Sequence, residues 1–233
     1  PTGFPEIDII SSGLQVGDLT VIASRPSIGK SALALSIADN ISSSLIPVAI
    51  FSMELNKSQI FARLVASRSR VNINNGDITP DELNQLAKAT VEFFDDSGPV
   101  AISDLRNITV DDVREKSIRL KQECGYIGVV IIDSLQMMKG CEIDNLLGLK
   151  SLASELDCHV ILTSQVGDSV EFRSNKRPTM FDVRDITGIE YIPDTLIFLY
   201  RDDYYTKDKC ENPGIAELNF IRQRTGPSGV VVK

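Results

Sequence analysis

One eight-residue segment constrains the fold more than any other, and it reads Ser24-Arg25-Pro26-Ser27-Ile28-Gly29-Lys30-Ser31. A short apolar run at 19–23 precedes it, and residues 32–41 repeat apolar side chains at helical spacing. The order is therefore strand, loop, helix. In the pattern G-x-x-x-x-G-K-[S/T], backbone N–H groups cradle phosphates, the lysine reaches the outer phosphates and the hydroxyl holds Mg²⁺. The segment predicts a phosphate-binding loop, although Ser24 stands where the first glycine is usual; a turn with a solvated lysine is the alternative.

An acidic residue follows the most apolar run of the chain. Asp133 comes directly after Val129-Val130-Ile131-Ile132, and an unpaired carboxylate at the end of a buried strand is unfavourable. Mg²⁺ that bridges nucleotide phosphates takes such an acid from a strand beside the phosphate loop. We therefore expect Ser31 and Asp133 to be metal ligands, with ATP and Mg²⁺ as cofactors. A polar strand cap at the surface is the alternative interpretation of Asp133.

Two further polar residues follow predicted strands. Glu54 comes after the strand at 47–51, and Gln165 ends the strand that begins at Val160. Both would project from the carboxyl edge of the sheet, where ligands bind in open α/β sheets. Since hydrolysis needs a group that positions or deprotonates water, we predict Glu54 as the base and Gln165 as a group facing the γ-phosphate. Taken alone, they would be a helix-start charge and a surface amide.

The rest of the chain alternates between predicted strands and helices. Further strands are expected at 100–103, 129–132, 160–163, 195–200 and 216–222. Helices are expected at 32–41, at 58–70 and after two capping pairs, Thr79 with Glu82 and Thr109 with Asp112. Residues 166–193 show no clear period, which is typical of a long functional loop. The alternation predicts one α/β domain over residues 1–233, with a mostly parallel twisted sheet and helices on both faces.

Composition excludes several classes of protein. The four cysteines are isolated in sequence and the chain has one histidine, which argues against a zinc site. Free thiols are typical of a reducing compartment, so we expect a cytoplasmic protein. Apolar runs are too short to cross a bilayer, and the N-terminus has neither an initiator Met nor a signal-peptide pattern, so we expect an excised domain. The net charge of −8 means that any polyanion must meet a local basic patch.

Taken together, the motifs resemble a known family. The matching segments are Thr2-Gly3-Phe4, Ser12-Gly13-Leu14, Arg25-Pro26-Ser27, Gly29-Lys30-Ser31, Phe51-Ser52-Met53-Glu54, Ile132-Asp133-Ser134-Leu135-Gln136, Ser164-Gln165, Lys176-Arg177-Pro178 and Gln223-Arg224-Thr225-Gly226-Pro227. In order and spacing they resemble the C-terminal motor domain of the DnaB-type replicative DNA helicases over nearly the whole chain. The resemblance implies a RecA-like core that works as a ring hexamer, encircles single-stranded DNA and translocates 5′ to 3′ on ATP. It also implies a missing N-terminal domain, and primase and a helicase loader as partners of the full-length protein.

The resemblance also assigns residue roles. It makes Lys30 and Ser31 the phosphate and Mg²⁺ ligands, Asp133 the Walker B acid, Glu54 the base and Gln165 the γ-phosphate sensor. It further implies that Arg222 and Arg224 form a basic pair donated in trans to the neighbouring subunit's ATP. An arginine supplied in this way neutralises transition-state charge and is worth about 10³–10⁵ in rate. Without the resemblance, both arginines would be interpreted as solvated side chains on an edge strand.

Three segments depart from the family pattern. Val166-Gly167-Asp168 replaces the usual Leu-Asn-Arg, and in Arg184-Asp185-Ile186-Thr187-Gly188-Ile189-Glu190 the glycine is moved by one position. Between Met138 and Leu149 the chain is shorter than the family's basic loop. The residues expected to contact DNA are Arg173, Lys176, Arg177, Arg184, Asp185 and Gly188. No aromatic stacking platform is evident there, so we expect contacts to phosphates without base recognition.

Two other functions remain open on sequence grounds. A RecA-type recombinase or loader ATPase would share the core but form filaments; Arg25-Pro26-Ser27 and Gln223-Arg224-Thr225-Gly226-Pro227 argue against it. A nucleotide-binding assembly module that no longer hydrolyses ATP would explain Ser24 and the altered loop. Retention of Lys30, Glu54 and the other catalytic candidates argues against that module.

Overall fold

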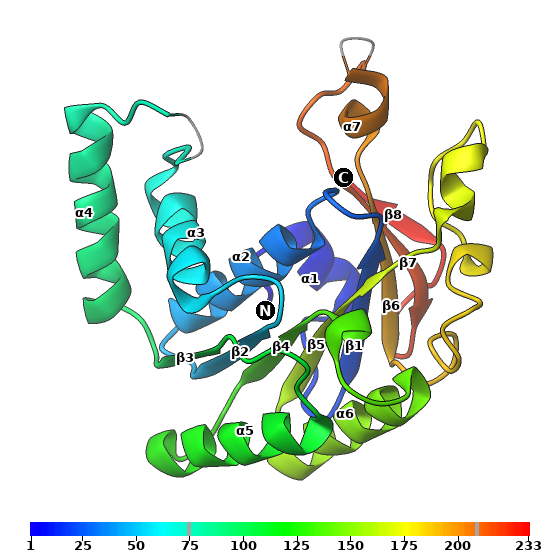
Figure 1. Cartoon of the computed structure of the whole chain (residues 1–233), viewed down its shortest axis with the longest axis horizontal. Helices are drawn as coiled ribbons and strands as arrows, with labels where there is room; N and C mark the ends of the chain where they lie inside the picture. Colours follow the sequence, from blue (N-terminus) through cyan, green and yellow to red (C-terminus); the bar gives the residue numbers. More distant parts are fainter. Residues whose placement is uncertain (74–75, 208–209) are drawn as a thin grey trace.

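The computed structural model of this chain describes residues 1–73, 76–207 and 210–233, and its centre is one twisted sheet (Figure 1). The strands are β1 (Leu19–Ser24), β2 (Val48–Ser52), β3 (Val100–Ser103), β4 (Val129–Asp133), β5 (His159–Gln165), β6 (Thr195–Tyr200), β7 (Glu217–Gln223) and β8 (Val230–Val232). Their order across the sheet is β3-β2-β4-β5-β1-β6-β7-β8. The predicted strands are confirmed to within one or two residues at their ends; β8 was not predicted.

Strand direction divides the sheet into two parts. The pairs from β3 to β6 are all parallel, whereas β6 with β7 and β7 with β8 are antiparallel. The mostly parallel sheet is therefore confirmed. Because β7 lies between β6 and β8, it is not an edge strand, although β8 pairs only with Leu218–Phe220 and leaves the end of β7 uncovered on that side.

Helices cover both faces of the sheet, as predicted. They are α1 (Pro5–Ser11), α2 (Lys30–Ser42), α3 (Lys57–Ser69), α4 (Pro80–Asp95), α5 (Val110–Cys124), α6 (Glu142–Leu156) and α7 (Asp202–Thr206). In Figure 1, α1 and α2 lie on one face, and α5 and α6 on the other. Successive strand residues point to opposite faces, so Val21 joins the core beneath α5 and α6 while Ile22 joins the core beneath α2.

Local capping fixes where several helices begin. At α4, the Thr79 side chain accepts from the Glu82 amide and Glu82 reaches back to the Thr79 amide; Thr109 and Asp112 do the same at α5. Both predicted capping boxes are confirmed. Helix α6, which the sequence interpretation did not identify, begins within the segment that is shorter than in the family. The long loop is organised by two short 3-10 turns, η2 (Asp168–Phe172) and η3 (Met180–Asp182).

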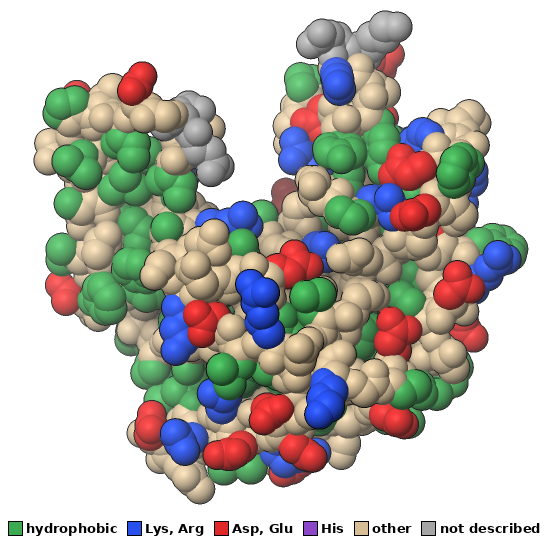
Figure 2. All heavy atoms as spheres, in the orientation of Figure 1, with side chains coloured by type: hydrophobic (Ala, Val, Ile, Leu, Met, Phe, Trp, Pro, Cys, Tyr) green, Lys and Arg blue, Asp and Glu red, His purple; other side chains and the backbone are tan. Residues whose placement is uncertain are grey.

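Helices α3 and α4 pack against each other beside the main body of the domain (Figure 1). The Phe61 and Phe93 rings meet edge to face at 5.4 Å, and Phe94 beside them is exposed. Figure 2 shows hydrophobic side chains gathered over this helix pair. In the part of the chain that the structure describes, no helix combines the length and the apolar character needed to cross a bilayer.

Candidate nucleotide site

The phosphate-binding loop connects β1 to α2 at the carboxyl edge of the sheet. Ser27 and Gly29 have φ values of 65° and 119°, in the region that favours glycine, whereas Ser24 ends β1 outside it. The backbone at position 24 therefore does not require glycine. Ser24 is buried, and its hydroxyl donates to the Arg25 carbonyl at 2.8 Å. Helix α2 begins at Lys30 with no side-chain cap. Its first N–H groups are thus available to phosphate oxygens.

The two predicted metal ligands lie on neighbouring elements. Asp133 ends β4 and pairs in register with Ser52 at the end of β2. Ser31, Ser52 and Asp133 line the same small cavity of about 10 Å³. The Thr163 hydroxyl donates to Asp133 Oδ1 and orients that carboxylate. An alcohol and a carboxylate fit the ligand preferences of Mg²⁺.

Few acidic or imidazole side chains are available to a cation at this position. Among residues 1–73, 76–207 and 210–233, no group of three or more His, Cys, Asp or Glu side chains converges on a metal position. Mg²⁺ keeps near-octahedral coordination and usually takes few protein ligands beside phosphate and water. The residues present therefore fit a metal bound together with a nucleotide.

Glu54 reaches the same edge from β2. It is exposed, and its Oε1 accepts a hydrogen bond from the Ser134 hydroxyl at 3.4 Å. The amide of Met53 donates to the Asp133 carbonyl at 2.9 Å, which ties the ends of β2 and β4 together. Glu54 therefore lies beside the end of β4, at the edge of the sheet that carries Asp133.

Gln165 is held by a residue to which the sequence interpretation gave no role. The Gln136 side chain donates from Nε2 to Ser164 Oγ at 2.9 Å and accepts from the Gln165 amide at 3.0 Å. Gln165 also pairs in register with Ser24. Gln136 thus positions the end of β5 against the phosphate-binding loop. The motif Ile132-Asp133-Ser134-Leu135-Gln136 contained this signal, but only the fold shows which strand Gln136 contacts.

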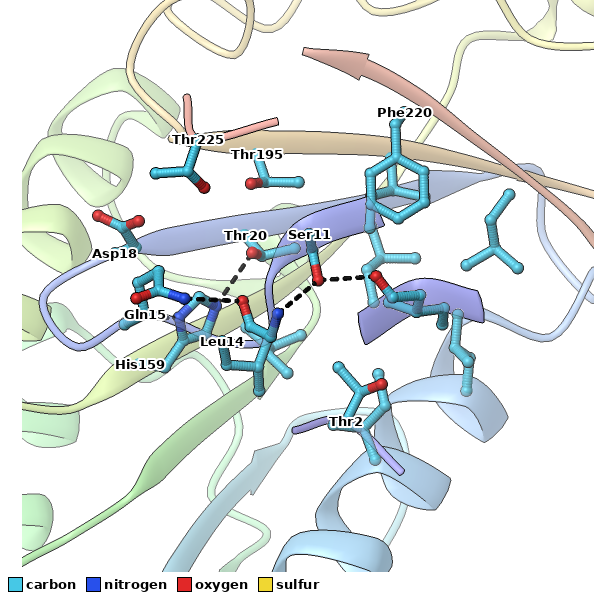
Figure 3. A pocket seen from close by; sticks show the side chains of 18 residues that line it. Thr2, Ser11, Leu14, Gln15, Asp18, Thr20, His159, Thr195, Phe220 and Thr225 are labelled. Atoms are coloured by element: carbon cyan, nitrogen blue, oxygen red, sulfur yellow. Dashed lines mark hydrogen bonds between the residues drawn. The ribbon is translucent and has the colours of Figure 1, made fainter. Parts of the chain in front are cut away.

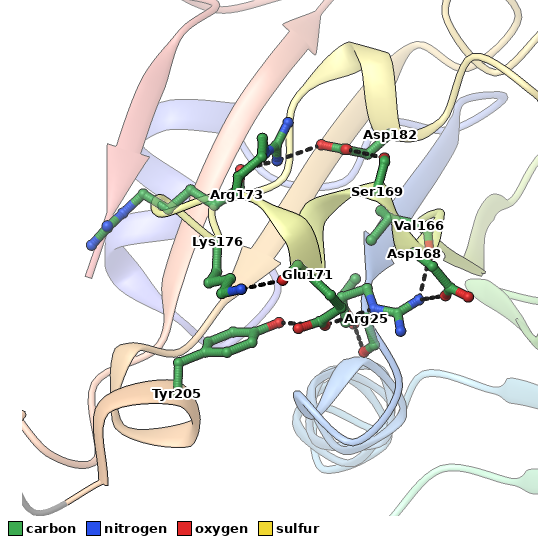
Figure 4. Close-up of polar contacts among 11 residues, drawn as sticks. Arg25, Val166, Asp168, Ser169, Glu171, Arg173, Lys176, Asp182 and Tyr205 are labelled. Carbon is green, nitrogen blue, oxygen red and sulfur yellow. Dashed lines mark hydrogen bonds and ion pairs between the residues drawn. The ribbon is translucent and has the colours of Figure 1, made fainter.

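Arg25 ties the phosphate-binding loop to the segment after β5 (Figure 4). Its Nε donates to Glu171 Oε1 at 2.9 Å, its Nη1 donates to the Val166 carbonyl at 3.1 Å, and it also pairs with Asp168. Burial lowers the pKa of Arg25, but its bonds to Glu171 and Asp168 outweigh that effect and raise the pKa. Asp168, which replaces an arginine of the family pattern, thus has a partner within this chain.

The basic residues predicted to contact DNA mostly have intrachain partners. Arg173 donates to Asp182 Oδ2 at 2.8 Å and to the Arg177 carbonyl at 2.9 Å, while Lys176 donates to the Glu171 carbonyl. Burial alone raises the pKa of Asp182, yet its bonds to Ser169, the Thr179 amide and Arg173 bring it below its usual value. Arg173 therefore stabilises the conformation of the loop, in addition to any contact with a ligand.

Arg177 and Arg184 differ in how firmly they are paired. Arg177 makes two hydrogen bonds to Glu217, at 2.6 and 2.9 Å, and lies over the Tyr200 ring at 4.5 Å from its centroid. The Arg184 side chain is 71% exposed, and its carboxylate neighbour, Asp185, is 3.9 Å away and itself exposed. Of the four predicted DNA-contacting cations, Arg184 thus has the weakest ion pair within the described chain.

Gly188 is required by its backbone conformation. Its φ is +93°, and an added Cβ would lie 2.5 Å from Ile192 Cδ1 and 3.3 Å from Ile143 Cγ1. The glycine therefore permits a buried turn against α6. Gly188 and Asp185 remain predicted DNA contacts.

Arg222 and Arg224 lie at the opposite edge of the sheet from the phosphate-binding loop. Because β7 is antiparallel, its end at Gln223 pairs with Thr195, the first residue of β6. The six residues of β1, about 20 Å long, separate this edge from the loop at Lys30. Arg222 Nη1 donates to the Glu190 carbonyl at 3.1 Å. The fold thus does not bring either arginine to the phosphate-binding loop of the same chain.

A small pocket occupies the same edge (Figure 3). It encloses about 30 Å³, far too little for a nucleotide, and its lining includes His159, Thr20 and Asp18. His159 hydrogen-bonds through Nδ1 to the Gln15 carbonyl at 2.7 Å and through Nε2 to the Thr20 hydroxyl at 3.0 Å. Burial lowers the pKa of this histidine. His159 is therefore a packed core residue, buried with both ring nitrogens hydrogen-bonded.

The fold and the site define a RecA-like P-loop core. A strand-loop-helix phosphate site lies beside an acid-bearing parallel strand, and Glu54 and Gln165 reach the same edge. Residues 1–232 match the family model described as DnaB-like helicase C terminal domain. The chain belongs to this family.

Individual relatives agree with that assignment. The chain is 41% identical over 245 residues to the replicative DNA helicase DnaB of Geobacillus stearothermophilus, covering 99% of this chain and 53% of the relative. It is 40% identical, with the same coverage, to the replicative DNA helicase DnaC of Bacillus subtilis (strain 168). The chain thus spans about half the length of these curated relatives.

Solved structures give the same result for the fold. A structure described as that of a DnaB-like replicative helicase and its interactions with primase superposes with a TM-score of 0.91 at 31% identity, over all of this chain and 59% of that one. A second solved structure, described as an ATPase domain, superposes with a TM-score of 0.90 at 31% identity, over all of this chain and 86% of that one. The predicted RecA-like fold is therefore confirmed.

Proposed function

We propose that this chain is the ATP-hydrolysing motor domain of a longer replicative DNA helicase, located in the cytoplasm. The main support is the convergence of Lys30, Glu54, Asp133 and Gln165 on the carboxyl edge of the sheet, combined with family membership over the whole chain. ATP and Mg²⁺ are the proposed cofactors. Single-stranded DNA, identical subunits in a ring hexamer, primase and a helicase loader are the proposed partners.

In the proposed reaction, the first turn of α2 and Lys30 bind the phosphates, and Ser31 and Asp133 hold the cation. The metal neutralises charge on the transferred phosphoryl group when it is bound. Glu54 orients or deprotonates the attacking water, and Gln165 contacts the γ-phosphate. Since Arg222 and Arg224 lie near the start of β1, a strand of about 20 Å whose far end leads into their own phosphate loop, we propose that they act on the nucleotide of a neighbouring subunit.

The test uses the full-length protein. We expect ATP turnover that single-stranded DNA stimulates, and unwinding of a forked duplex that requires a 5′ tail. DNA-bound filaments without unwinding would favour a recombinase or loader ATPase, and absence of turnover would favour a non-hydrolysing assembly module. Arg224→Ala should abolish turnover while ATP affinity stays nearly unchanged; unchanged turnover would refute the role in trans.

A further inference from the structure

Arg224 is anchored by one carboxylate, that of Asp194. The Arg224 amide donates to the Asp194 carbonyl at 2.9 Å, and Arg224 Nη1 donates to Asp194 Oδ1 at 3.3 Å. Asp194 directly precedes β6, and its side chain is only 6% exposed. Backbone and side chain of the arginine are thus both held by the same residue.

Asp194 is itself fixed from two other directions. Its Oδ2 accepts from the Leu19 amide at 2.8 Å and from Lys150 Nζ at 2.6 Å, so β1 and α6 both hold the carboxylate. Burial alone raises the pKa of Asp194, but the bonds from Lys150, Leu19 and Arg224 lower it overall. The group is therefore a fixed anion, and Lys150 and Arg224 share it.

A second carboxylate completes a balanced cluster of two anions and two cations. Asp18 Oδ1 lies 3.3 Å from Lys150 Nζ and 3.9 Å from Arg224 Nη1. In Figure 3, Asp18 lies at the same end of the small pocket as Thr225, the residue after Arg224. The cluster thus surrounds the Nη1 end of the Arg224 guanidinium.

The other nitrogens of the Arg224 guanidinium remain accessible. The side chain is 67% exposed, and within the described residues Nη1 is the only atom of its guanidinium with a hydrogen-bond partner. Guanidinium has five N–H donors, so Nε and Nη2 remain for an anion outside this chain. Anchoring at one nitrogen also restricts the rotamers of a side chain that is otherwise free.

We propose that Asp194 is a positioning residue that aims Arg224 at the phosphates bound by a neighbouring subunit, with Asp18 and Lys150 supporting it. This inference rests on the proposed trans role of Arg224. It predicts that loss of Asp194 harms the neighbour's site and spares the nucleotide site of its own subunit. A residue that only stabilised β1 would instead harm its own phosphate-binding loop.

The first measurement is steady-state turnover of full-length Asp194→Asn. We expect kcat to fall about 10- to 100-fold, as for a misplaced catalytic group, while the dissociation constant for ATP stays within about twofold. Asp39→Asn is the matched control, because it removes the charge of another buried carboxylate. Asp39 lies on α2 and pairs with Arg68 of α3 at 2.6 Å. That control should lower thermal stability and leave kcat unchanged. Wild-type kcat in Asp194→Asn would overturn the proposal.

The deciding measurement mixes two impaired subunits by co-expression. Lys30→Ala loses its own nucleotide site but keeps Arg224, whereas Asp194→Asn keeps its nucleotide site. In randomly mixed rings of equal composition, about one quarter of the interfaces combine the two intact halves. Turnover should therefore rise well above that of either variant alone, towards about one quarter of the wild-type value.

A parallel mixture of Arg224→Ala with Lys30→Ala separates this proposal from the proposed function. Recovery in that mixture without recovery for Asp194→Asn means that Asp194 acts within its own subunit, which overturns the inference alone. Recovery in neither mixture refutes the trans role of Arg224, and the inference falls with it. If Asp194→Asn does not assemble, the more exposed Asp18→Asn is decisive: it must lower kcat and recover with Lys30→Ala.

Discussion

Nε of Arg25 lies 2.9 Å from Oε1 of Glu171, so the phosphate-binding loop is tied to the segment that follows β5. Tyr205 from α7 also donates to Glu171 Oε1, at 3.3 Å. Three parts of the chain that are distant in sequence thus meet at one carboxylate. The phosphate-binding loop and this segment are thus joined by a charged hydrogen bond.

Loss of Glu171 should destabilise the domain more than loss of Asp168. The Arg25 and Glu171 side chains are partly buried, whereas Asp168 is 82% exposed, and exposed ion pairs contribute little in water. We expect Glu171→Gln to reduce the free energy of unfolding by about 1–2 kcal/mol and Asp168→Asn by less than about 1 kcal/mol. Urea denaturation measures both values, and the reverse order would contradict this account.

Gln136→Ala should impair catalysis without impairing ATP binding. The substitution removes the side chain that holds both Ser164 and the Gln165 amide, while Lys30 and the first turn of α2 are untouched. We expect kcat of the full-length protein to fall about 10-fold or more, since small displacements of catalytic groups have large effects. ATP affinity should stay within about twofold.

Gln136→Glu serves as the comparison, because Ser164 can donate to a carboxylate while the Gln165 amide keeps its acceptor. It should retain more activity than the alanine variant. Equal losses of kcat in the two variants would show that the hydrogen bonds of Gln136 do not account for its effect on catalysis.

Arg184→Ala should weaken binding of single-stranded DNA more than Arg177→Ala does. Arg177 is already neutralised by Glu217, whereas Arg184 is exposed with a weak pair. A lost phosphate contact reduces the slope of log affinity against log salt by about 0.7 for a single strand. Titrations of labelled oligonucleotide at several salt concentrations with the full-length protein measure this slope. A larger change for Arg177→Ala would contradict the prediction.

The stability of the domain should fall as the solution is acidified below about pH 6.5, the ordinary pKa of histidine. Burial lowers the pKa of His159 in the folded chain, so protons bind the unfolded chain more readily. The contribution is therefore fully present above the unfolded pKa and is lost as pH falls, by at most about 1.4 kcal/mol per pH unit.

Because the chain has one histidine, His159→Gln is the matched control. Urea denaturation across this pH range should give a steeper loss for the wild type than for the variant, and the difference isolates His159 from the carboxylates. Parallel curves would show that this histidine does not govern the effect.

Features with local signals could be predicted from the sequence. Asp133 follows an apolar run that marks a buried strand, and the helix caps Thr79 and Thr109 are marked by acidic residues three positions later. Helix α6 lacks such a start signal, because its N-cap residue, Cys141, makes no side-chain cap hydrogen bond; it was not predicted, although Leu146, Leu149 and Leu152 follow helical spacing.

The ion pairs could not be predicted in the same way. Arg25 and Asp168 are separated by 143 residues, and Arg177 and Glu217 by 40. Each charge alone is compatible with a solvated side chain, and only the sheet order brings the partners together. For the same reason Arg173 and Arg177 were interpreted solely as DNA contacts, although each also has a carboxylate partner.

The antiparallel direction of β7 has a consequence for assembly. It places Arg224 and the phosphate-binding loop at opposite edges of the sheet. If Arg224 acts in trans as proposed, two copies that complete a site join head to tail, in a heterologous contact. Such a contact closes if the rotation between neighbours is a whole fraction of a turn without translation, and otherwise it continues as an open helix. On the proposed trans role, the geometry of this interface decides between ring and filament, and both forms would use the same residues.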